Sequence, residues 1–240
     1  MVMPPASAEE LLERGRSLAG LTLGELAARS DTRVPEDLKR AKGWVGALFE
    51  QYLGATAKSR AVPDFEALGI ELKTLPVSLE GRPLETTFVC TIPLLEMARQ
   101  EWKQSGVFKK LERVLWVPVE GTRTTPVAAR RIGTPLLWSP SPEEEADLRF
   151  DWEELAGMIG CGRVEDVTGH FGRFLQVRPK AKDSYARRRA SGVDGEVFRA
   201  LPRGFYLRTQ FTARILRQHF ALPHDRDFSN LASPAPRAAG

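Results

Sequence analysis

The N-terminal part of the chain carries apolar side chains at intervals of three or four residues, which is the spacing of one face of an α-helix. Three helices are expected there, over residues 7–20, 22–30 and 36–53. Ser7 and Thr22 stand where the first two begin, and a hydroxyl at that position accepts a hydrogen bond from a free backbone N–H of the first turn. The pattern therefore predicts a helical N-terminal part.

Short apolar runs bounded by glycine and proline follow these helices, and runs of this length and composition are typical of β-strands. They read LGIELKTLPV, TTFVCTIPL, ERVLWVPVE and TPLLWSP, which are residues 68–77, 86–94, 112–120 and 134–140. We expect them to be strands of one central sheet.

The C-terminal part alternates between helix-like and strand-like patterns. Residues 141–160 open with serine, proline and three glutamates, which favour a helix start, and they predict a long helix. Residues 171–182 alternate as a strand, residues 185–192 read as a basic loop, and residues 202–222 run from a short strand into a terminal helix. Together the elements predict a mixed α/β fold, with a central mixed sheet flanked by helices and an arrangement in two lobes.

A single domain is expected over residues 1–228, with residues 229–240 as a disordered tail that is rich in alanine and proline. The chain of 240 residues is 42% hydrophobic, which is enough to bury a sizeable core. No apolar stretch approaches the length of a membrane span, and the start is acidic where a signal peptide would be basic. We therefore expect a soluble, cytoplasmic protein without a membrane contact.

Cysteine and histidine are too sparse to suggest a zinc site, a disulfide framework or a histidine-based catalytic triad. The residues concerned are Cys90, Cys161, His170, His219 and His224. Metal chemistry through oxygen ligands stays open. The formal charge of +4 mildly favours a polyanionic partner.

The stretch PDFEALGIELKT, residues 63–74, brackets an apolar run with three charges of mixed sign. In a strand, side chains two residues apart project to the same side, so Glu71 and Lys73 are predicted to lie together. Asp64 reaches the same place if the chain turns back before the strand, a turn that Gly69 eases. Glu50, in the preceding predicted helix, offers a further carboxylate.

Carboxylates with a lysine beside them can bind a hard divalent cation through oxygen and leave positions for water and a phosphate. Such an ion polarises a phosphodiester and activates water, while the lysine orients that water or stabilises developing negative charge. The same charges also fit an exposed strand with an unimportant ion pair, and a solvated helix face is the ordinary place for Glu50. The pattern alone leaves both interpretations open.

The order of Glu50 and PDFEALGIELKT resembles the catalytic core of the PD-(D/E)xK nucleases, a superfamily that includes many type II restriction endonucleases. Further blocks resemble the MutH family of DNA mismatch repair endonucleases and follow that family's order from about residue 20 to about residue 220. They are LGELA, LKRAKGWVGALFEQYLGA, DFEALGIELKTLPV, GRPLETTFVC, RVLWVPVEG, RRIGTPLLWSP, DWEEL, LQVRPKA and LPRGFYLR.

This resemblance implies a restriction-endonuclease-like fold that holds DNA in a cleft between two lobes, with the catalytic residues in the N-terminal lobe and the DNA-readout loop in the C-terminal lobe. It also implies a Mg²⁺-dependent endonuclease, with Mn²⁺ as a substitute, that acts on double-stranded DNA as a monomer. It nicks the unmethylated strand at hemimethylated GATC sites after activation by MutL. Carried over by position, Asp64 and Glu71 are metal ligands, Glu50 is an accessory carboxylate, and Lys73 positions water or stabilises charge. Lys110 corresponds to a further lysine near the scissile phosphate, although a solvated lysine before a strand is an equally ordinary interpretation.

The resemblance also implies the DNA contacts. Arg178, Pro179 and Lys180 form a triplet on a loop that enters the major groove, where arginine and lysine can donate to guanine O6 and N7. Tyr206 corresponds to a residue that senses adenine methylation, and Phe88 to an aromatic that approaches the minor groove. Both aromatics also fit the ordinary core of a strand.

Lys42, just before the apolar part of the third predicted helix, is a further DNA-binding candidate. The run Arg187 to Arg189, together with Lys182, concentrates positive charge that fits backbone phosphates or a solvated loop. The segment that contains this run matches the family only loosely, and no stretch of the sequence indicates a binding surface for MutL.

Two other functions stay open. A stand-alone restriction-like endonuclease with the same core would cut both strands, which generally needs a dimer or a second site. A catalytically silent DNA-binding protein would be expected to lack one of the catalytic side chains, yet Asp64, Glu71 and Lys73 are all present.

Overall fold

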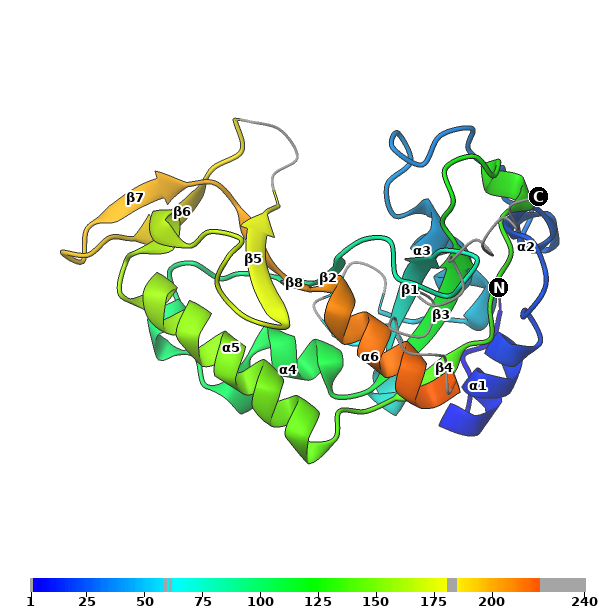
Figure 1. Ribbon diagram of the computed structural model, residues 1–240, viewed down its shortest axis with the longest axis horizontal. Helices are drawn as coiled ribbons and strands as arrows, with labels where there is room; N and C mark the ends of the chain where they lie inside the picture. The colour runs from blue at the N-terminus through cyan, green and yellow to red at the C-terminus, as the bar shows by residue number, and fades with distance from the viewer. Residues whose placement is uncertain (1, 58–59, 61, 181–184, 221–240) are drawn as a thin grey trace, which may run out of the picture.

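The computed structural model describes residues 2–57, 60, 62–180 and 185–220, which form two lobes side by side (Figure 1). Each lobe contains a three-stranded sheet, and a two-stranded ribbon belongs to the C-terminal lobe. The mixed α/β class is confirmed. Lys182, His224 and the predicted tail lie outside the described residues.

Three helices pack around the first hydrophobic core, in the N-terminal lobe. The first, α1 (Ala8–Arg16), is capped by Ser7 as predicted, and α2 (Leu23–Arg29) begins with a capping box centred on Thr22. These caps satisfy backbone N–H groups that the first turn of a helix leaves free.

The third helix, α3 (Trp44–Leu53), is shorter than the predicted helix 36–53, which was wrong in its first half. Gly43 precedes α3 with a φ angle of 84°, a left-handed conformation that interrupts an α-helix, so the residues before it form turns. Gly54 ends the helix at a φ angle of 81°, as glycine commonly does.

The expected mixed sheet lies at the centre of the N-terminal lobe. Its middle strand, β3 (Val114–Glu120), runs parallel to β1 (Glu71–Val77) and antiparallel to β4 (Leu136–Trp138). Successive residues of β3 serve different cores: Leu115 packs with the N-terminal helices and Trp116 with the C-terminal lobe. The sheet is therefore covered on both faces.

The second sheet has the order β2 (Thr87–Thr91), β8 (Arg203–Leu207) and β5 (Leu175–Pro179), and both pairings are antiparallel. The placement of strand 86–94 in the central sheet was therefore wrong. The apolar pattern of β2 predicts a strand but carries no information about its partner, which lies near the other end of the chain.

The C-terminal lobe contains α4 (Gly106–Leu111), α5 (Pro142–Gly160) and α6 (Thr209–Phe220). Ser141 caps α5 in a capping box, as the serine and glutamates predict. Short 3₁₀ segments cover Glu66–Leu68, Met97–Arg99, Trp102–Gln104, Val127–Ala129 and Val164–Asp166. Among the described residues, no helix combines the length and apolar character that a membrane crossing requires.

The prediction of a basic loop over residues 185–192 is wrong for the second half of this range, because residues 188–191 form a strand. This strand is β6 (Arg188–Ser191), which pairs in antiparallel fashion with β7 (Val197–Ala200). Ala190 and Ala200 are buried against the second core, so apolar packing on one face holds the ribbon in a sheet conformation.

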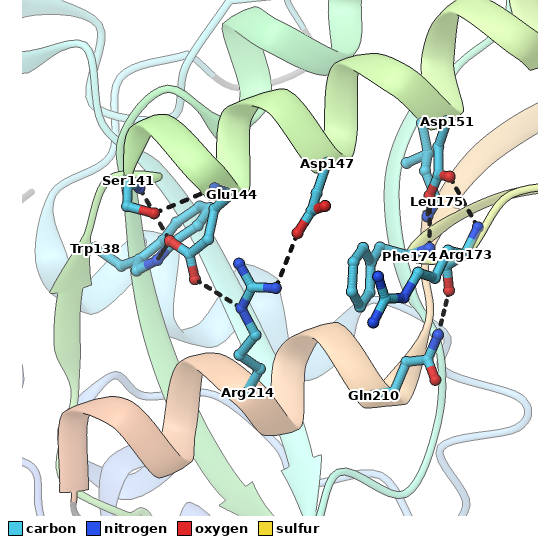
Figure 2. A network of polar contacts seen from close by, with 10 residues as sticks. All are labelled: Trp138, Ser141, Glu144, Asp147, Asp151, Arg173, Phe174, Leu175, Gln210 and Arg214. Carbon is cyan, nitrogen blue, oxygen red and sulfur yellow. Dashed lines mark hydrogen bonds and ion pairs between the residues drawn. The ribbon is translucent and has the colours of Figure 1, made fainter.

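A buried carboxylate fixes the start of β5, as Figure 2 shows. Asp151 of α5 is 2% exposed, and its oxygens accept hydrogen bonds from three consecutive backbone N–H groups. The donors are Arg173 N at 2.8 Å, Phe174 N at 2.5 Å and Leu175 N at 2.8 Å. Asp151 therefore ties the strand that carries Arg178 to the long helix.

A second part of the network joins α6 to α5 (Figure 2). Arg214 of α6 contacts Asp147 at 2.9 Å and Glu144 at 3.5 Å. Phe211, also on α6, stacks edge-on against Trp138 of β4 at a centroid distance of 6.1 Å. Helix α6 thus packs against elements of both lobes and holds them together.

Candidate active site and DNA-binding face

A tight turn before β1 brings Asp64 to the start of that strand. Phe65 and Ile70 pair as an isolated antiparallel bridge, and Gly69 completes the turn with a φ angle of 63°. Asp64 Oδ2 accepts a hydrogen bond of 2.8 Å from Leu72 N. The chain turns back here as the sequence predicted.

Glu71 and Lys73 project from the same side of β1 and form an ion pair of 3.1 Å. Lys110 of α4 reaches the other carboxylate oxygen of Glu71 at 2.8 Å and the backbone oxygen of Val62 at 2.7 Å. The Glu71 and Lys73 side chains are only 7% and 8% exposed, so the interpretation as an exposed strand is wrong. Charges buried this far need partners, and the two lysines supply them.

Glu50 of α3 and Asp64 add negative charge to this cluster. Partial burial, followed by the charge of Glu71, raises the pKa of Glu50. The same two causes raise the pKa of Asp64 to about 6, against the effect of the Leu72 N–H hydrogen bond. In the part of the chain that the structure describes, neither Glu50 nor Asp64 belongs to an ion pair. The site therefore carries acidic oxygens that a cation would stabilise.

The donor set suits a hydrated, hard cation better than a fully caged one. No three acidic, histidine or cysteine side chains among the described residues converge closely enough to enclose a metal ion. Mg²⁺ typically binds through one or two carboxylates and keeps water and phosphate oxygens as its other ligands. Asp64 and Glu71 fit that pattern, with Glu50 as an accessory carboxylate, whereas a structural zinc site would need a closed set of four ligands.

Cys90 of β2 lies close to the same cluster, which the sequence did not indicate. Burial raises the pKa of its thiol to about 12, an effect that the nearby Lys73 and Lys110 only partly oppose. A Cβ added at Gly106, the first residue of α4, would lie 3.1 Å from its sulfur. Cys90 is therefore a neutral packing residue between β2 and α4.

The predicted DNA-reading residues lie together on the outer face of the second sheet. Phe88 of β2 and Gln176 of β5 both stand opposite Tyr206 of β8, so the three form one row across the sheet. The Phe88 and Tyr206 rings meet edge-on at 5.3 Å. Both rings are partly exposed, so the interpretation of either as an ordinary core residue is wrong. Partial burial also raises the pKa of the Tyr206 hydroxyl, against the charge of Arg178.

Two cations accompany this row. The guanidinium of Arg178 lies 5.9 Å from the centre of the Tyr206 ring, and Lys180 Nζ lies 4.2 Å from the centre of the Phe88 ring. Arg178 and Pro179 are the last residues of β5, so within the triplet the expectation of a loop holds only for Lys180. The triplet is thus presented by a rigid strand end.

A hollow of about 720 Å³ opens beside Arg178. Gln176 lines it and is 6% exposed, although the sequence gave no reason to single out this glutamine. Arg178 reaches across to Thr86 with a hydrogen bond of 2.8 Å. The hollow therefore continues the outer face of the sheet.

Lys42 is exposed in the turn before α3. Within the described ranges, no hydrogen bond or ion pair joins it to the other candidate residues. The structure thus brings together Glu50, Asp64, Glu71, Lys73 and Lys110 in one group and Phe88, Arg178, Lys180 and Tyr206 in another. Lys42 stands apart from both.

Removing the charge of Asp64 is expected to stabilise the metal-free protein. Because the folded-state pKa is raised from 3.8 to about 6, the ionised carboxylate opposes folding once the pH exceeds this range. One pKa unit corresponds to about 1.4 kcal/mol, so with allowance for partial exposure we expect Asp64→Asn to gain roughly 1–2 kcal/mol at pH 8. The asparagine oxygen can keep the Leu72 N–H hydrogen bond.

Urea unfolding in EDTA measures this effect. The gain should shrink as the pH falls toward 4, where the wild-type Asp64 is itself protonated. Glu154→Gln, at an exposed position of α5, is the control and should change stability little at either pH. If Asp64→Asn is no more stable than wild type at pH 8, the claim that the ionised Asp64 carboxylate opposes folding is contradicted.

Asp64, Glu71, Lys73 and Lys110 lie within the part of the chain that matches a family model, and Glu50 lies just before it. Residues 53–151 match the model described as DNA mismatch repair enzyme MutH. The chain is 55% identical over 225 residues to a DNA mismatch repair protein MutH of Klebsiella pneumoniae, covering 94% of this chain and 97% of that protein. It is also 55% identical over 222 residues to the DNA mismatch repair protein MutH of Salmonella paratyphi C, covering 92% and 96%. This chain belongs to the MutH family of DNA mismatch repair enzymes.

Proposed function

We propose that this DNA mismatch repair endonuclease nicks the unmethylated strand of hemimethylated GATC sites, with Mg²⁺ held by Asp64 and Glu71 and with Glu50 as an accessory carboxylate. The observation that carries the proposal is the cluster itself, in which acidic oxygens and two lysines meet at the start of one strand. When bound, Mg²⁺ or its substitute Mn²⁺ polarises the phosphodiester and lowers the pKa of water.

The two lysines have separate tasks in this proposal. Lys73 Nζ has three N–H donors and uses one on Glu71, so the others are available to orient the attacking water or to stabilise the charge on phosphorus oxygens. Lys110 Nζ holds Glu71 and Val62, which leaves one donor for a non-bridging phosphate oxygen. Lys73 therefore acts at the reacting water, and Lys110 acts at the phosphate.

The outer face of the second sheet is proposed to read the DNA. Arg178 and Lys180 can donate to guanine in the major groove, and Phe88 is placed to lie against a base step. Tyr206, fixed between Phe88 and Arg178, offers a hydroxyl and a ring edge to adenine. A methyl group on the adenine amine removes a hydrogen-bond donor and adds bulk, which a packed tyrosine can detect.

Tyr206→Phe is expected to keep nicking activity but to lose methylation discrimination. The phenylalanine retains the contact with Phe88, while the hydroxyl is lost. Because one hydrogen bond contributes about 1 kcal/mol, the ratio of rates on unmethylated and methylated strands should fall about fivefold to tenfold. Strand-specific rates on end-labelled duplexes measure this ratio. Tyr52→Phe, on α3, is the control, and an unchanged ratio in Tyr206→Phe removes the sensing role.

A supercoiled plasmid with several GATC sites tests the chemistry. We expect conversion to the open circle in Mg²⁺, no conversion in EDTA, and none by Asp64→Asn under either condition. Linear DNA as the first product would instead support the stand-alone restriction-like enzyme. Conversion in EDTA, or by Asp64→Asn, would contradict the metal site.

We further propose that the chain acts as a cytoplasmic monomer whose nicking is stimulated by MutL, as the family membership suggests. One cluster of catalytic residues per chain suits the cleavage of one strand. Sedimentation of the protein on DNA tests the monomer, and nicking rates with and without purified MutL test the stimulation. A dimer on a single site, or a rate that MutL leaves unchanged, would contradict these proposals.

A further inference from the structure

The ribbon of β6 and β7 places two arginines directly opposite each other. Arg189 of β6 is paired with Arg199 of β7, and both side chains are exposed. Side chains opposed in this way have Cβ atoms about 5 Å apart, and like charges at that distance destabilise the pairing. Electrostatic repulsion therefore destabilises the pairing of β6 with β7, and an anion bound between the two arginines would remove this repulsion.

The two arginines face away from the protein. Ala190 and Ala200, the next residue along each strand, are 1% and 2% exposed, and Phe198 packs against the same core. Because alternate residues of a strand face opposite sides, Arg189 and Arg199 point to solvent. Their guanidinium groups are free to meet a partner that approaches the outer face of the ribbon.

Among the described residues, no carboxylate neutralises this pair. The acidic residues of the hairpin are Asp194 and Glu196, and Glu196 belongs by alternation to the face opposite Arg199, with its carboxylate turned back to Asp194 N at 3.1 Å. Throughout the described ranges, the ion pairs involve other residues than Arg189 and Arg199. The described carboxylates therefore do not offset the repulsion between the two arginines.

The ribbon is firmly connected to the DNA-reading sheet. Strand β7 leads directly into β8, which carries Tyr206, and Figure 1 shows the ribbon continuing from β5 and β8 on the side away from β1. Its turn packs closely on the end of α5, since a Cβ added at Gly162 would lie 2.1 Å from the backbone carbon of Gly192. The arginines thus keep a fixed position relative to the proposed base-reading residues.

We propose that Arg189 and Arg199 bind backbone phosphates of the DNA outside the recognition sequence. The inference rests on the proposed function, because it assumes that the outer face of β2, β8 and β5 reads the duplex. Arginine forks suit phosphate oxygens, and a phosphate between two opposed guanidinium groups converts their repulsion into attraction. The contact adds affinity that depends on salt and on duplex length but not on sequence.

Binding of the double variant R189A/R199A to a hemimethylated duplex in EDTA tests this, because cleavage is then absent. Each phosphate contact contributes about 0.9 to the slope of log K against log salt, so the slope should fall by about 1.8 and low-salt affinity by roughly tenfold. On a duplex of about one helical turn, wild type and variant should bind alike. R189K/R199K keeps the charges and should retain most of the slope.

The matched control R16A/R29A removes two exposed arginines from α1 and α2 and should leave the slope unchanged. Urea unfolding verifies that R189A/R199A is folded, and relief of repulsion should leave it at least as stable as wild type. A salt slope that is unchanged in R189A/R199A overturns the proposal. If the variant keeps the slope but loses its response to MutL, the ribbon contacts a protein and not DNA.

Failure of this inference can be told apart from failure of the proposed function. Wild-type nicking of the same duplex in Mg²⁺ reports on the function, and its absence removes the function whatever the ribbon does. Wild-type nicking combined with an unchanged salt slope in R189A/R199A overturns the ribbon contact alone.

Discussion

Lys73→Ala is expected to lower the nicking rate by about 10²- to 10³-fold while DNA affinity in EDTA changes little. Lys73 is 9% exposed at the centre of the cluster, and its ammonium is the group best placed to act on the water or the phosphate. Removal of a preorganised charge inside a partly buried site affects the transition state more than the ground state. Single-turnover nicking at saturating protein measures the chemical step directly.

The neighbouring lysines provide the comparison. Lys110→Ala should slow nicking less than Lys73→Ala, because Lys110 reaches Glu71 from the next element and contacts phosphate only through its remaining donor. Lys109→Ala, at the exposed adjacent position on α4, is the control and should react as wild type. Near-normal nicking by Lys73→Ala would remove this residue from the catalytic assignment.

Asp151→Ala is expected to lower the free energy of unfolding by about 3–5 kcal/mol, because each buried N–H group left without its acceptor costs about 1–3 kcal/mol. The alanine leaves three consecutive N–H groups at the start of β5 without acceptors in a buried position. Because that strand carries Arg178, site-specific DNA binding should weaken together with stability. Urea unfolding followed by tryptophan fluorescence measures the loss.

Asp151→Asn tests the same idea if the alanine variant does not fold. Asparagine keeps one acceptor oxygen, so its loss of stability should lie between wild type and alanine. Asp147→Ala, on the same helix, removes a partly exposed partner of Arg214 and should cost less than about 1 kcal/mol. Equal effects of Asp151→Ala and Asp147→Ala would contradict the role given to the buried carboxylate.

The proximity of Asp64, Glu71 and Lys73 was predictable because its determinants are local. Alternation along a strand places Glu71 beside Lys73, and a glycine turn a few residues earlier places Asp64 at the same point. Ser7, Thr22 and Ser141 likewise mark helix starts through contacts within one turn. Such patterns depend only on residues that are close in sequence, so they can be interpreted without knowledge of the fold.

Other features depend on partners that lie far away in the sequence. The pairing of β2 with β8 removes the strand of Phe88 from the central sheet, although its apolar pattern matches the other strands. Asp151 and Gln176 gain their significance only from burial against distant elements, and neither stands out in the sequence. Strand β6 was predicted as a loop because its run of arginines is typical of an exposed segment, and the small alanines that are buried on its inner face give no clear apolar pattern.

Strand-resolved cleavage of a hemimethylated GATC duplex in Mg²⁺, labelled separately on each strand, tests the central proposal most directly. Fully methylated and unmethylated duplexes complete the set, and Asp64→Asn serves as the inactive control. We predict a single nick in the unmethylated strand of the hemimethylated duplex and no cleavage of the fully methylated one. Equal cleavage of both strands, or nicking of the fully methylated duplex, would contradict the account.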